Sequence, residues 1–346
     1  MQAAVWLGAD VVAVRKTDLP ATPSGWARVH VEYAGICGTD LAIFAGKHPR
    51  AATPLILGHE IVGTVVQDVP NGPLIGSRVT IDPLISCHEC RACRDGAPHV
   101  CRELKFFGID APGGLADYID VPANRLIQVP LDVPAKRAAW AEPLAVAVHA
   151  VVRADMASRA SVLIFGAGPI GLLVALVARH SGAGRVTLVE PNPIRQDVAA
   201  KLGFETAPPG TDSVAWFRST NDGEGADVVF DTAGHPSVAA ILPSAVRETG
   251  TVVMVAVYKE TPLFDLRAVC FGEHTVVGAR VYTRKDFQRA VNLLAGDPLG
   301  LDSIPTTVIP LRSVRQAFAL ATSAKAPMKV FLQPDDGGME TATRYG

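Results

Sequence analysis

The second half of the chain alternates between short apolar segments and helical patterns. The segments that predict strands are 162–165, 186–190, a short one near 204–207, 227–231, 251–257 and 275–281. Helical patterns fill most gaps, as in PIGLLVALVARHSG, PIRQDVAAKLG and PSVAAILPSAVRETG. Almost wholly apolar strands that alternate with helices indicate a parallel sheet covered on both faces. We therefore predict a doubly wound α/β domain after residue 150.

The first 150 residues have a different pattern of apolar and polar residues. WARVHVEYAGI alternates apolar and polar positions, and EIVGTVV, SRVTI and DYIDV are further short strand candidates between Gly, Pro and Asp. A chain of 346 residues is also too long for one ordinary core. We therefore predict two domains, the first rich in strands.

Charge and hydropathy exclude several classes of protein. The net charge is −2 and no block of five like charges occurs, which argues against a nucleic-acid or anionic-membrane binder. The longest apolar run, 160–178, contains three glycines and Pro169, so we interpret it as a strand turning into a helix and not as a membrane span. The N-terminus has no basic segment typical of a secretory signal. We expect a cytoplasmic protein with a small-molecule partner.

A glycine motif follows the first strand of the alternating region. Gly166, Gly168 and Gly171 stand in G-x-G-x-x-G register where a strand turns into a helix, a context in which backbone and helix N-terminus bind a pyrophosphate. The next strand ends in Glu190, whose carboxylate suits the ribose hydroxyls of NAD and would repel the 2′-phosphate of NADP. A packing turn in another α/β protein is the alternative. The candidate cofactor-binding residues are Gly166, Gly168, Pro169, Ile170, Gly171, Glu190, Arg195 and Val257.

Four of the six cysteines fall in CHECRACRDGAPHVC. They are Cys87, Cys90, Cys93 and Cys101. Four thiolates at this spacing close a tetrahedral zinc site with no position for substrate, so the predicted role is structural. An iron–sulfur cluster and free thiols are the alternatives, although the final gap of seven residues departs from the ferredoxin pattern. Disulfides are disfavoured because cytosolic thiols stay reduced, and His88 and His99 are interpreted as bystanders.

A second set of metal-binding side chains is scattered along the first domain. GICGTD supplies Cys37, LGHEIVG supplies His59 and Glu60, and WAEPLAVAVHA supplies Glu142. Each alone has an ordinary interpretation as a buried or helix-starting residue. Together, sulfur, imidazole and carboxylate suit a catalytic zinc that keeps one position open.

These motifs resemble the medium-chain, zinc-dependent alcohol dehydrogenase family. The likeness runs in family order through GICGTD, GHEIVGTV, the four-cysteine loop, GGLADY, AEPLAVAVHA, GAGPIG and VEP, and covers nearly the whole chain. The chain looks closest to the polyol, butanediol and threonine dehydrogenase branch, and GTVVMVAV with VVGARVYTRKDF is most similar to butanediol dehydrogenases.

The resemblance implies a domain order. Residues 1–150 would form a GroES-like catalytic domain with the structural-zinc loop at 87–101, and 151–283 a Rossmann NAD-binding domain. Residues 284–334 would return to the catalytic domain, and 335–346 would be a disordered tail. The family also suggests a homo-oligomer, either a dimer or a tetramer.

The resemblance also implies roles for single residues. Cys37, His59 and Glu142 correspond to catalytic zinc positions, with Glu60 as a ligand or an exchanging neighbour. Thr39 would hydrogen-bond the substrate hydroxyl and Asp40 would orient His59. Many relatives carry a histidine five residues after the zinc cysteine as an outer proton relay. Here that residue is Ala42, with His48 as a nearby candidate.

The implied reaction is oxidation of a secondary alcohol in a vicinal diol, sugar alcohol or cyclitol, with two zinc ions per chain and hydride transfer to NAD. Three alternatives remain: a threonine-type dehydrogenase, a zinc-free quinone or enone reductase, and a non-catalytic NAD-binding protein with only a structural zinc. Phe44, Phe107 and Trp140 are pocket or core residues, Arg280 is a possible carboxylate ligand, and His149 either reaches the cofactor or packs.

Overall fold

The computed structural model describes residues 1–67, 69–70 and 72–335. They divide into two compact units, one made of 1–85, 105–131 and the chain from 306 on, the other of 86–104 and 132–305. We call them unit 1 and unit 2. Among the described residues, no helix combines the length and apolar character needed to cross a bilayer.

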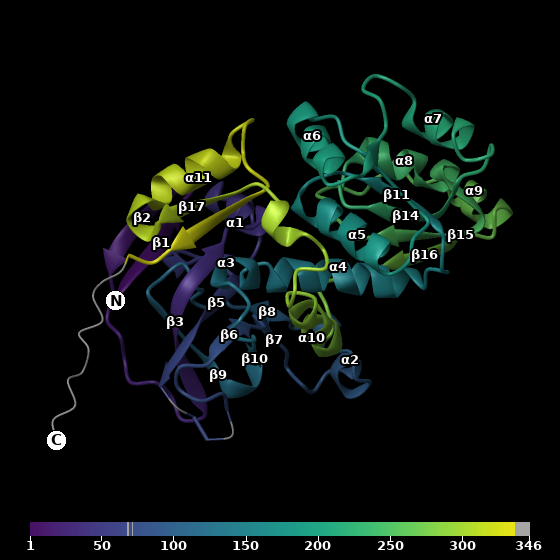
Figure 1. Cartoon of the computed structure of the whole chain (residues 1–346). Coiled ribbons are helices and arrows are strands. Elements are labelled where there is room, and N and C mark those ends of the chain that lie inside the picture. Colours follow the sequence, from purple (N-terminus) through teal and green to yellow (C-terminus); the bar gives the residue numbers. More distant parts are fainter. Residues whose placement is uncertain (68, 71, 336–346) are drawn as a thin grey trace. The chain divides into compact units, whose positions relative to one another are not determined.

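Unit 2 contains the predicted doubly wound fold (Figure 1). Six strands form one parallel sheet in the order β13-β12-β11-β14-β15-β16. Their bounds are β11 (Ser161–Phe165), β12 (Arg185–Val189), β13 (Glu205–Thr206), β14 (Ala226–Asp231), β15 (Val246–Met254) and β16 (Thr275–Gly278). Strand order reverses between β11 and β14, which is where such sheets bind nucleotides. The predicted α/β class is therefore confirmed.

Helices cover both faces of this sheet. The longer ones are α4 (Ala141–Ala154), α5 (Pro169–His180), α6 (Pro193–Lys201), α7 (Ser213–Ser219), α8 (Pro236–Ala245), α9 (Leu266–Phe271) and α10 (Arg284–Asn292). Helix α4 contacts α5, α10, β15 and β16, while α7 and α8 pack on Leu163, Phe165 and Val229. The alternate residues Val162 and Ile164 are also fully buried, as expected for a strand enclosed on both sides.

One predicted helix is too long. We expected the pattern PSVAAILPSAVRETG to be helical to Gly250, but α8 ends at Ala245 and 246–250 begin β15. Thr249 has φ +61°, a left-handed value that an α-helix cannot contain, and Val246 is β-branched.

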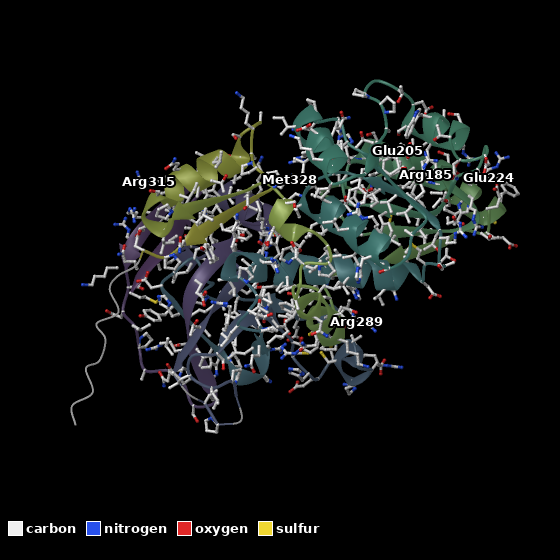
Figure 2. The ribbon with its side chains drawn as sticks, in the orientation of Figure 1. Arg185, Glu205, Glu224, Arg289, Arg315 and Met328 are labelled. Atoms are coloured by element: carbon white, nitrogen blue, oxygen red, sulfur yellow. The ribbon has the colours of Figure 1, made fainter. Side chains whose placement is uncertain are left out.

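At the edge of the sheet formed by β13, Arg185 and Glu205, labelled in Figure 2, join β12 to β13 through an ion pair of 2.7 Å.

Unit 1 is rich in strands, as its alternating sequence predicted, and its strand pairs are antiparallel except for the parallel pair β17 and β18. Its main sheet runs β10-β6-β5-β3-β18-β17, with β9 also on β3, and two small sheets are β2-β1-β4 and β7-β8. The strands are β1 (Gln2–Gly8), β2 (Val11–Lys16), β3 (Trp26–Gly35), β4 (Leu55–Ile56), β5 (Glu60–Gln67), β6 (Arg78–Ile81), β7 (Leu84–Ile85), β8 (Lys105–Phe106), β9 (Tyr118–Pro122), β10 (Leu126–Gln128), β17 (Thr306–Pro310) and β18 (Lys329–Gln333). Its helices include α1 (Gly38–Phe44) and α11 (Val314–Thr322).

The units do not follow the predicted domain boundaries. The cysteine segment 86–104, with α2 (Arg91–Arg94), and the segment with α3 (Ala135–Ala138) and α4 belong to unit 2, although we placed both within residues 1–150. Helix α10 also stays in unit 2 because it packs along α4, so only 306 onward returns to unit 1. The predicted tail, apart from Asp335, lies outside the described residues.

Candidate functional site

Three of the predicted zinc ligands come together in unit 1. Cys37 is the N-cap of α1, Glu60 is the first residue of β5, and His59 directly precedes that strand. One ligand atom from each side chain lies within 4.8 Å of the others, and both His59 and Glu60 are buried. Such a set of one sulfur, one nitrogen and one oxygen donor fits a zinc ion and leaves room for a further ligand.

Asp40 ties the two ligand-bearing segments together. Its carboxylate accepts the Cys37 N–H at 2.8 Å and the Gly58 N–H at 3.1 Å, and it is fully buried. Burial raises the pKa of Asp40, while the neighbouring His59 opposes that shift. The Asp40 Oδ1 to His59 Nδ1 distance is 3.8 Å, longer than a hydrogen bond. Asp40 therefore acts on the site mainly through the backbone.

Glu60 has a buried counter-ion that the sequence did not suggest. Lys329, on β18, is 4% exposed and places its ammonium on the Glu60 carboxylate. Gly35 provides the space, because a Cβ there would collide with Glu60 Oε2. A buried charge pair of this kind depends on both partners, since either alone would be an uncompensated charge.

Two further residues of unit 1 surround this set. The Thr39 hydroxyl lies 3.9 Å from Cys37 Sγ on the first turn of α1. His48 is half-buried, and its Nδ1 accepts the Ala51 N–H at 3.3 Å, so this nitrogen supports the loop. Burial foremost, and then Arg50, lowers the pKa of His48. His48 as the outer relay in place of Ala42 stays a prediction.

Glu142 belongs to unit 2, so its place at the catalytic zinc also stays a prediction. It lies in the first turn of α4 and is 5% exposed. The Tyr282 hydroxyl donates a hydrogen bond to Glu142 Oε1 at 2.9 Å. A carboxylate in the first turn of a helix interacts favourably with the helix dipole.

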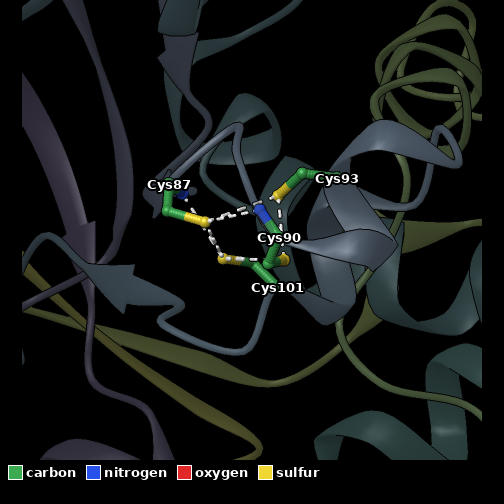
Figure 3. Close-up of side chains that lie close together, drawn as sticks. All are labelled: Cys87, Cys90, Cys93 and Cys101. Atoms are coloured by element: carbon green, nitrogen blue, oxygen red, sulfur yellow. Dashed lines mark hydrogen bonds between the residues drawn. The ribbon is translucent and has the colours of Figure 1, made fainter.

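The four-cysteine loop forms a compact sulfur cluster (Figure 3). Neighbouring Sγ atoms are 3.3 Å apart for Cys87 and Cys101, 3.5 Å for Cys90 and Cys93, 3.9 Å for Cys90 and Cys101, and 4.0 Å for Cys87 and Cys93. Zinc–sulfur bonds of ~2.3 Å in a tetrahedron separate the sulfurs by about 3.8 Å. All four cysteines are free thiols, and the spacing fits zinc.

Backbone N–H groups of this loop are placed to stabilise negative charge on the cysteine sulfurs. The Cys87 N–H points at Cys101 Sγ, and the Cys90 N–H points at Cys87 Sγ. Amide donors, that of Arg102 foremost, lower the pKa of Cys90 to about 6, whereas burial and the neighbouring sulfurs raise the pKa of Cys93 to about 12. Four thiolates this close together would repel one another, so all four can be charged only around a cation such as zinc.

The glycine motif has the geometry of a nucleotide-binding turn. Gly166 has φ +101°, Gly168 is the N-cap of α5, and Pro169 and Ile170 begin the helix. A Cβ on Gly171 would collide with the Gly166 carbonyl oxygen, so α5 can approach β11 this closely only with glycine there. A Cβ on Gly168 would have only Arg195 Nη1 nearby, at 3.7 Å, which leaves that backbone open to a ligand.

Glu190 and Arg195 lie beside this turn. Glu190 Oε2 accepts the Ala167 N–H at 2.9 Å, Oε1 accepts the Asn192 N–H at 2.8 Å, and Arg195 Nη1 is 3.9 Å from Oε2. Each carboxylate oxygen can accept a second hydrogen bond, so a ribose diol can still bind. Val257 is three residues beyond the end of β15 and 89% exposed.

Gly171→Ala is expected to weaken cofactor binding by at least about tenfold, because the added methyl must push α5 away from the Gly166 turn. Equilibrium titration of NADH fluorescence measures this effect. The matched control is Gly182→Ala, at a turn where the nearest atom to a Cβ is 3.8 Å away, although its φ of +94° will cost stability. Unchanged NADH affinity in Gly171→Ala would remove the motif from the cofactor site.

Other predicted side chains have structural positions. His149 is buried, with Nδ1 2.8 Å from Asp286 and its ring against His99, so it packs within unit 2. Phe107 and Trp140 are buried core residues, and Arg280 is exposed. Phe44 stacks on Phe318, with ring centroids 4.9 Å apart. Lys329, Gly35 and Tyr282 were missed because each contacts a residue distant in sequence.

The fold and the two groups of side chains that could hold a metal ion are those expected of a zinc-binding dehydrogenase. The family model for the alcohol dehydrogenase GroES-like domain matches residues 23–131, and the zinc-binding dehydrogenase model matches 169–296. The chain therefore belongs to the medium-chain, zinc-dependent alcohol dehydrogenase family, as its motifs predicted.

Individual relatives agree with this assignment. The 2-dehydro-3-deoxy-L-galactonate 5-dehydrogenase of Pseudoalteromonas atlantica is 37% identical over 96% of this chain and 98% of its own. The solved structure of 2R,3R-butanediol dehydrogenase from Bacillus subtilis has a TM-score of 0.89 and 27% identity, covering 96% of this chain and 99% of that one. A structure from Sinorhizobium meliloti 1021, described as a zinc-binding dehydrogenase bound to NADP, has a TM-score of 0.91, 29% identity and coverage of 96% and 99%.

These findings confirm several predictions together. The protein is a zinc-dependent oxidoreductase that acts on a secondary alcohol with a nicotinamide cofactor and a small-molecule substrate. The predicted polyol, butanediol and threonine dehydrogenase branch is likewise confirmed.

Proposed function

We propose that this protein oxidises one secondary hydroxyl of a polyhydroxylated small molecule, a sugar alcohol, sugar acid or vicinal diol, to the ketone, with NAD as hydride acceptor. The observation that carries the proposal is the group formed by Cys37, His59 and Glu60, whose ligand atoms lie within 4.8 Å of one another. A closed structural site would not present this mixed donor set.

The donor set fits zinc at the catalytic site, with Cys37, His59, Glu60 and Glu142 as the residues that would hold it. Bound there, zinc supplies the Lewis acidity that lowers the pKa of a substrate hydroxyl. Cys87, Cys90, Cys93 and Cys101 would hold a second, structural zinc, so that a loaded chain contains two ions.

The chain's own residues account for the other requirements. Thr39 is near enough to Cys37 to accept the proton of a substrate hydroxyl and pass it outward, and His48 is the candidate for the next step. Lys329 pairs with Glu60, so the net negative charge of the site is smaller than the charge of its ligands alone. Asp40 keeps the Cys37 and Gly58 backbones at a fixed separation.

We propose NAD rather than NADP because Glu190 directly follows β12 beside the glycine turn, where its carboxylate suits a ribose diol and repels a phosphate. Arg195, next to Gly168, would contact the cofactor phosphates or the adenosine ribose. The similar structure bound to NADP makes this choice worth a direct measurement.

The substrate class rests on the relatives. One is named for position 5 of a sugar acid and another for butanediol. Both names describe a hydroxyl group on a carbon next to another carbon that bears oxygen. We therefore extend the predicted range of vicinal diols, sugar alcohols and cyclitols to sugar acids.

The test is absorbance at 340 nm with purified, zinc-loaded protein. The substrates are L-galactonate, 2-dehydro-3-deoxy-L-galactonate, sorbitol, butanediol stereoisomers, an inosamine-type cyclitol and L-threonine, each with NAD and with NADP. We expect a polyol or sugar acid to give the highest kcat/KM, with NAD preferred at least tenfold. Preference for threonine would contradict the substrate class, and preference for NADP would contradict the role of Glu190.

We also propose that the protein is a cytoplasmic homo-oligomer, either a dimer or a tetramer. Strand β16 is the last strand of its sheet, and Val276 on it is 42% exposed. Nearby in sequence, Leu263, Leu266 and Phe271 are more than 70% exposed, an apolar surface that a second copy could cover. Six free thiols suit a reducing compartment. Light scattering measures the mass in solution.

A further inference from the structure

Tyr282 is a buried phenol whose hydroxyl contacts a predicted zinc ligand. The residue is 1% exposed, Glu142 is 5% exposed, and the hydrogen bond between them is 2.9 Å long. They are 140 positions apart in sequence. A neutral phenol orients a carboxylate without cancelling its charge, whereas the ammonium of Lys329 neutralises Glu60.

The backbone before Tyr282 is strained. Val281 has φ +44°, and the left-handed region is unfavourable for a β-branched side chain. Such a conformation persists only where the surrounding structure imposes it, and it is concentrated at functional sites. Here the strained residue directly precedes the one that contacts Glu142.

The contact is supported on the other side of Tyr282. The Thr283 side chain caps α10 by accepting a hydrogen bond from the Asp286 N–H. The Asp286 carboxylate in turn accepts a hydrogen bond from the Thr283 N–H, which completes a capping box. The same Asp286 carboxylate lies 2.8 Å from Nδ1 of the buried His149. Helix α10 is thus fixed to α4 by its first turn.

The two contacts on α4 are on one face of that helix. Glu142 and His149 are seven residues apart, about two helical turns, so they point in the same direction. Tyr282 and Asp286 meet them from the start of α10. His99, from the four-cysteine loop, packs on the His149 ring with centroids 5.2 Å apart.

We propose that Tyr282 is a positioning residue that holds Glu142, a proposed ligand of the catalytic zinc, in one orientation through the hydrogen bond to Oε1. This proposal rests on the proposed function, which assigns Glu142 to that zinc. It goes beyond it by assigning a role to a residue that no sequence motif indicated, and by explaining why strain is retained at Val281.

Tyr282→Phe is a clean test because it removes only the hydroxyl and keeps the ring that packs on Phe287, 5.0 Å away. The comparison set is Glu142→Gln, the double variant, and the control Tyr118→Phe, a half-buried tyrosine on β9 in unit 1. The probe is Co²⁺ in place of zinc. Its visible absorption spectrum and its affinity, measured against a chromophoric chelator, are read beside kcat and KM with NAD.

We expect Tyr282→Phe to weaken metal binding at the catalytic site by about 10–100-fold, to alter the Co²⁺ spectrum and to lower kcat more than it raises KM. Tyr118→Phe should match the wild type. In the Glu142→Gln background, the added Tyr282→Phe change should alter each quantity less than about twofold, because the residue acts through Glu142.

Two results overturn the proposal and leave the proposed function standing. In the first, Glu142→Gln is impaired while Tyr282→Phe keeps wild-type metal affinity, spectrum and kcat. In the second, Tyr282→Phe is equally harmful with and without Glu142. If Glu142→Gln itself matches the wild type in metal binding and turnover, Glu142 is not at the zinc, and both the proposal and that part of the proposed function are wrong.

Discussion

His59→Ala is expected to lower kcat/KM by at least about 10³-fold in a protein that still folds. Lewis-acid stabilisation at such a site is worth several kcal/mol, and ~4 kcal/mol corresponds to a factor of about 10³. Because the alanine side chain supplies no donor, only the Cys37 and Glu60 donors of the unit 1 group would remain. Initial rates at 340 nm measure the loss of activity, and mass spectrometry measures the zinc content of the same protein.

The control is His180→Ala, an exposed histidine at the end of α5. It should leave rate and metal content unchanged. We expect His59→Ala to lose one of two zinc ions per chain while its circular dichroism and melting temperature stay close to those of the wild type. Full activity in a His59→Ala protein would show that the reacting metal is not held by the Cys37, His59 and Glu60 group.

Cys90→Ser is expected to affect folding before chemistry. Cys90 is buried within the sulfur cluster, and replacing its thiolate leaves three sulfurs and a hydroxyl around a site that needs four soft donors. Loss of a structural metal is among the few single changes that cost more than about 4 kcal/mol of unfolding free energy. Thermal melting and zinc content measure the loss.

Cys270→Ser is the matched control, because Cys270 is exposed on α9 and outside the cluster. It should keep the wild-type melting temperature. A Cys90→Ser protein that lacks one zinc, yet melts and assembles like the wild type, would contradict a structural role for this loop. Chelator treatment at neutral pH should lower the melting temperature of the wild type and of Cys270→Ser to that of Cys90→Ser.

Local patterns in the sequence predicted the parts of this molecule whose physics is local. The G-x-G-x-x-G register, the apolar strands of unit 2 and the cysteine spacing each express a constraint within about 25 residues. The structure accordingly has the parallel sheet, the turn at Gly166 and the sulfur cluster where the sequence predicted them.

Long-range packing was not predictable in the same way. No local pattern pairs Lys329 with Glu60 or Tyr282 with Glu142, because the partners are 269 and 140 positions apart. The compact units divide the chain elsewhere than at residue 150 for a related reason. Helix α4 has a nearly all-apolar sequence, and only its contacts with α5 and α10 reveal which unit it belongs to.

The interleaved chain path has a consequence for biosynthesis. Strand β3, which is central to unit 1, pairs with β18, and the ammonium for Glu60 comes from residue 329. On the ribosome, the segments of unit 2 are complete once residue 305 has emerged, whereas unit 1 must wait for the last strand. We therefore expect the cysteine loop to be able to bind a metal before β18 has emerged, whereas the Cys37, His59 and Glu60 group gains its buried ammonium only when β18 is in place.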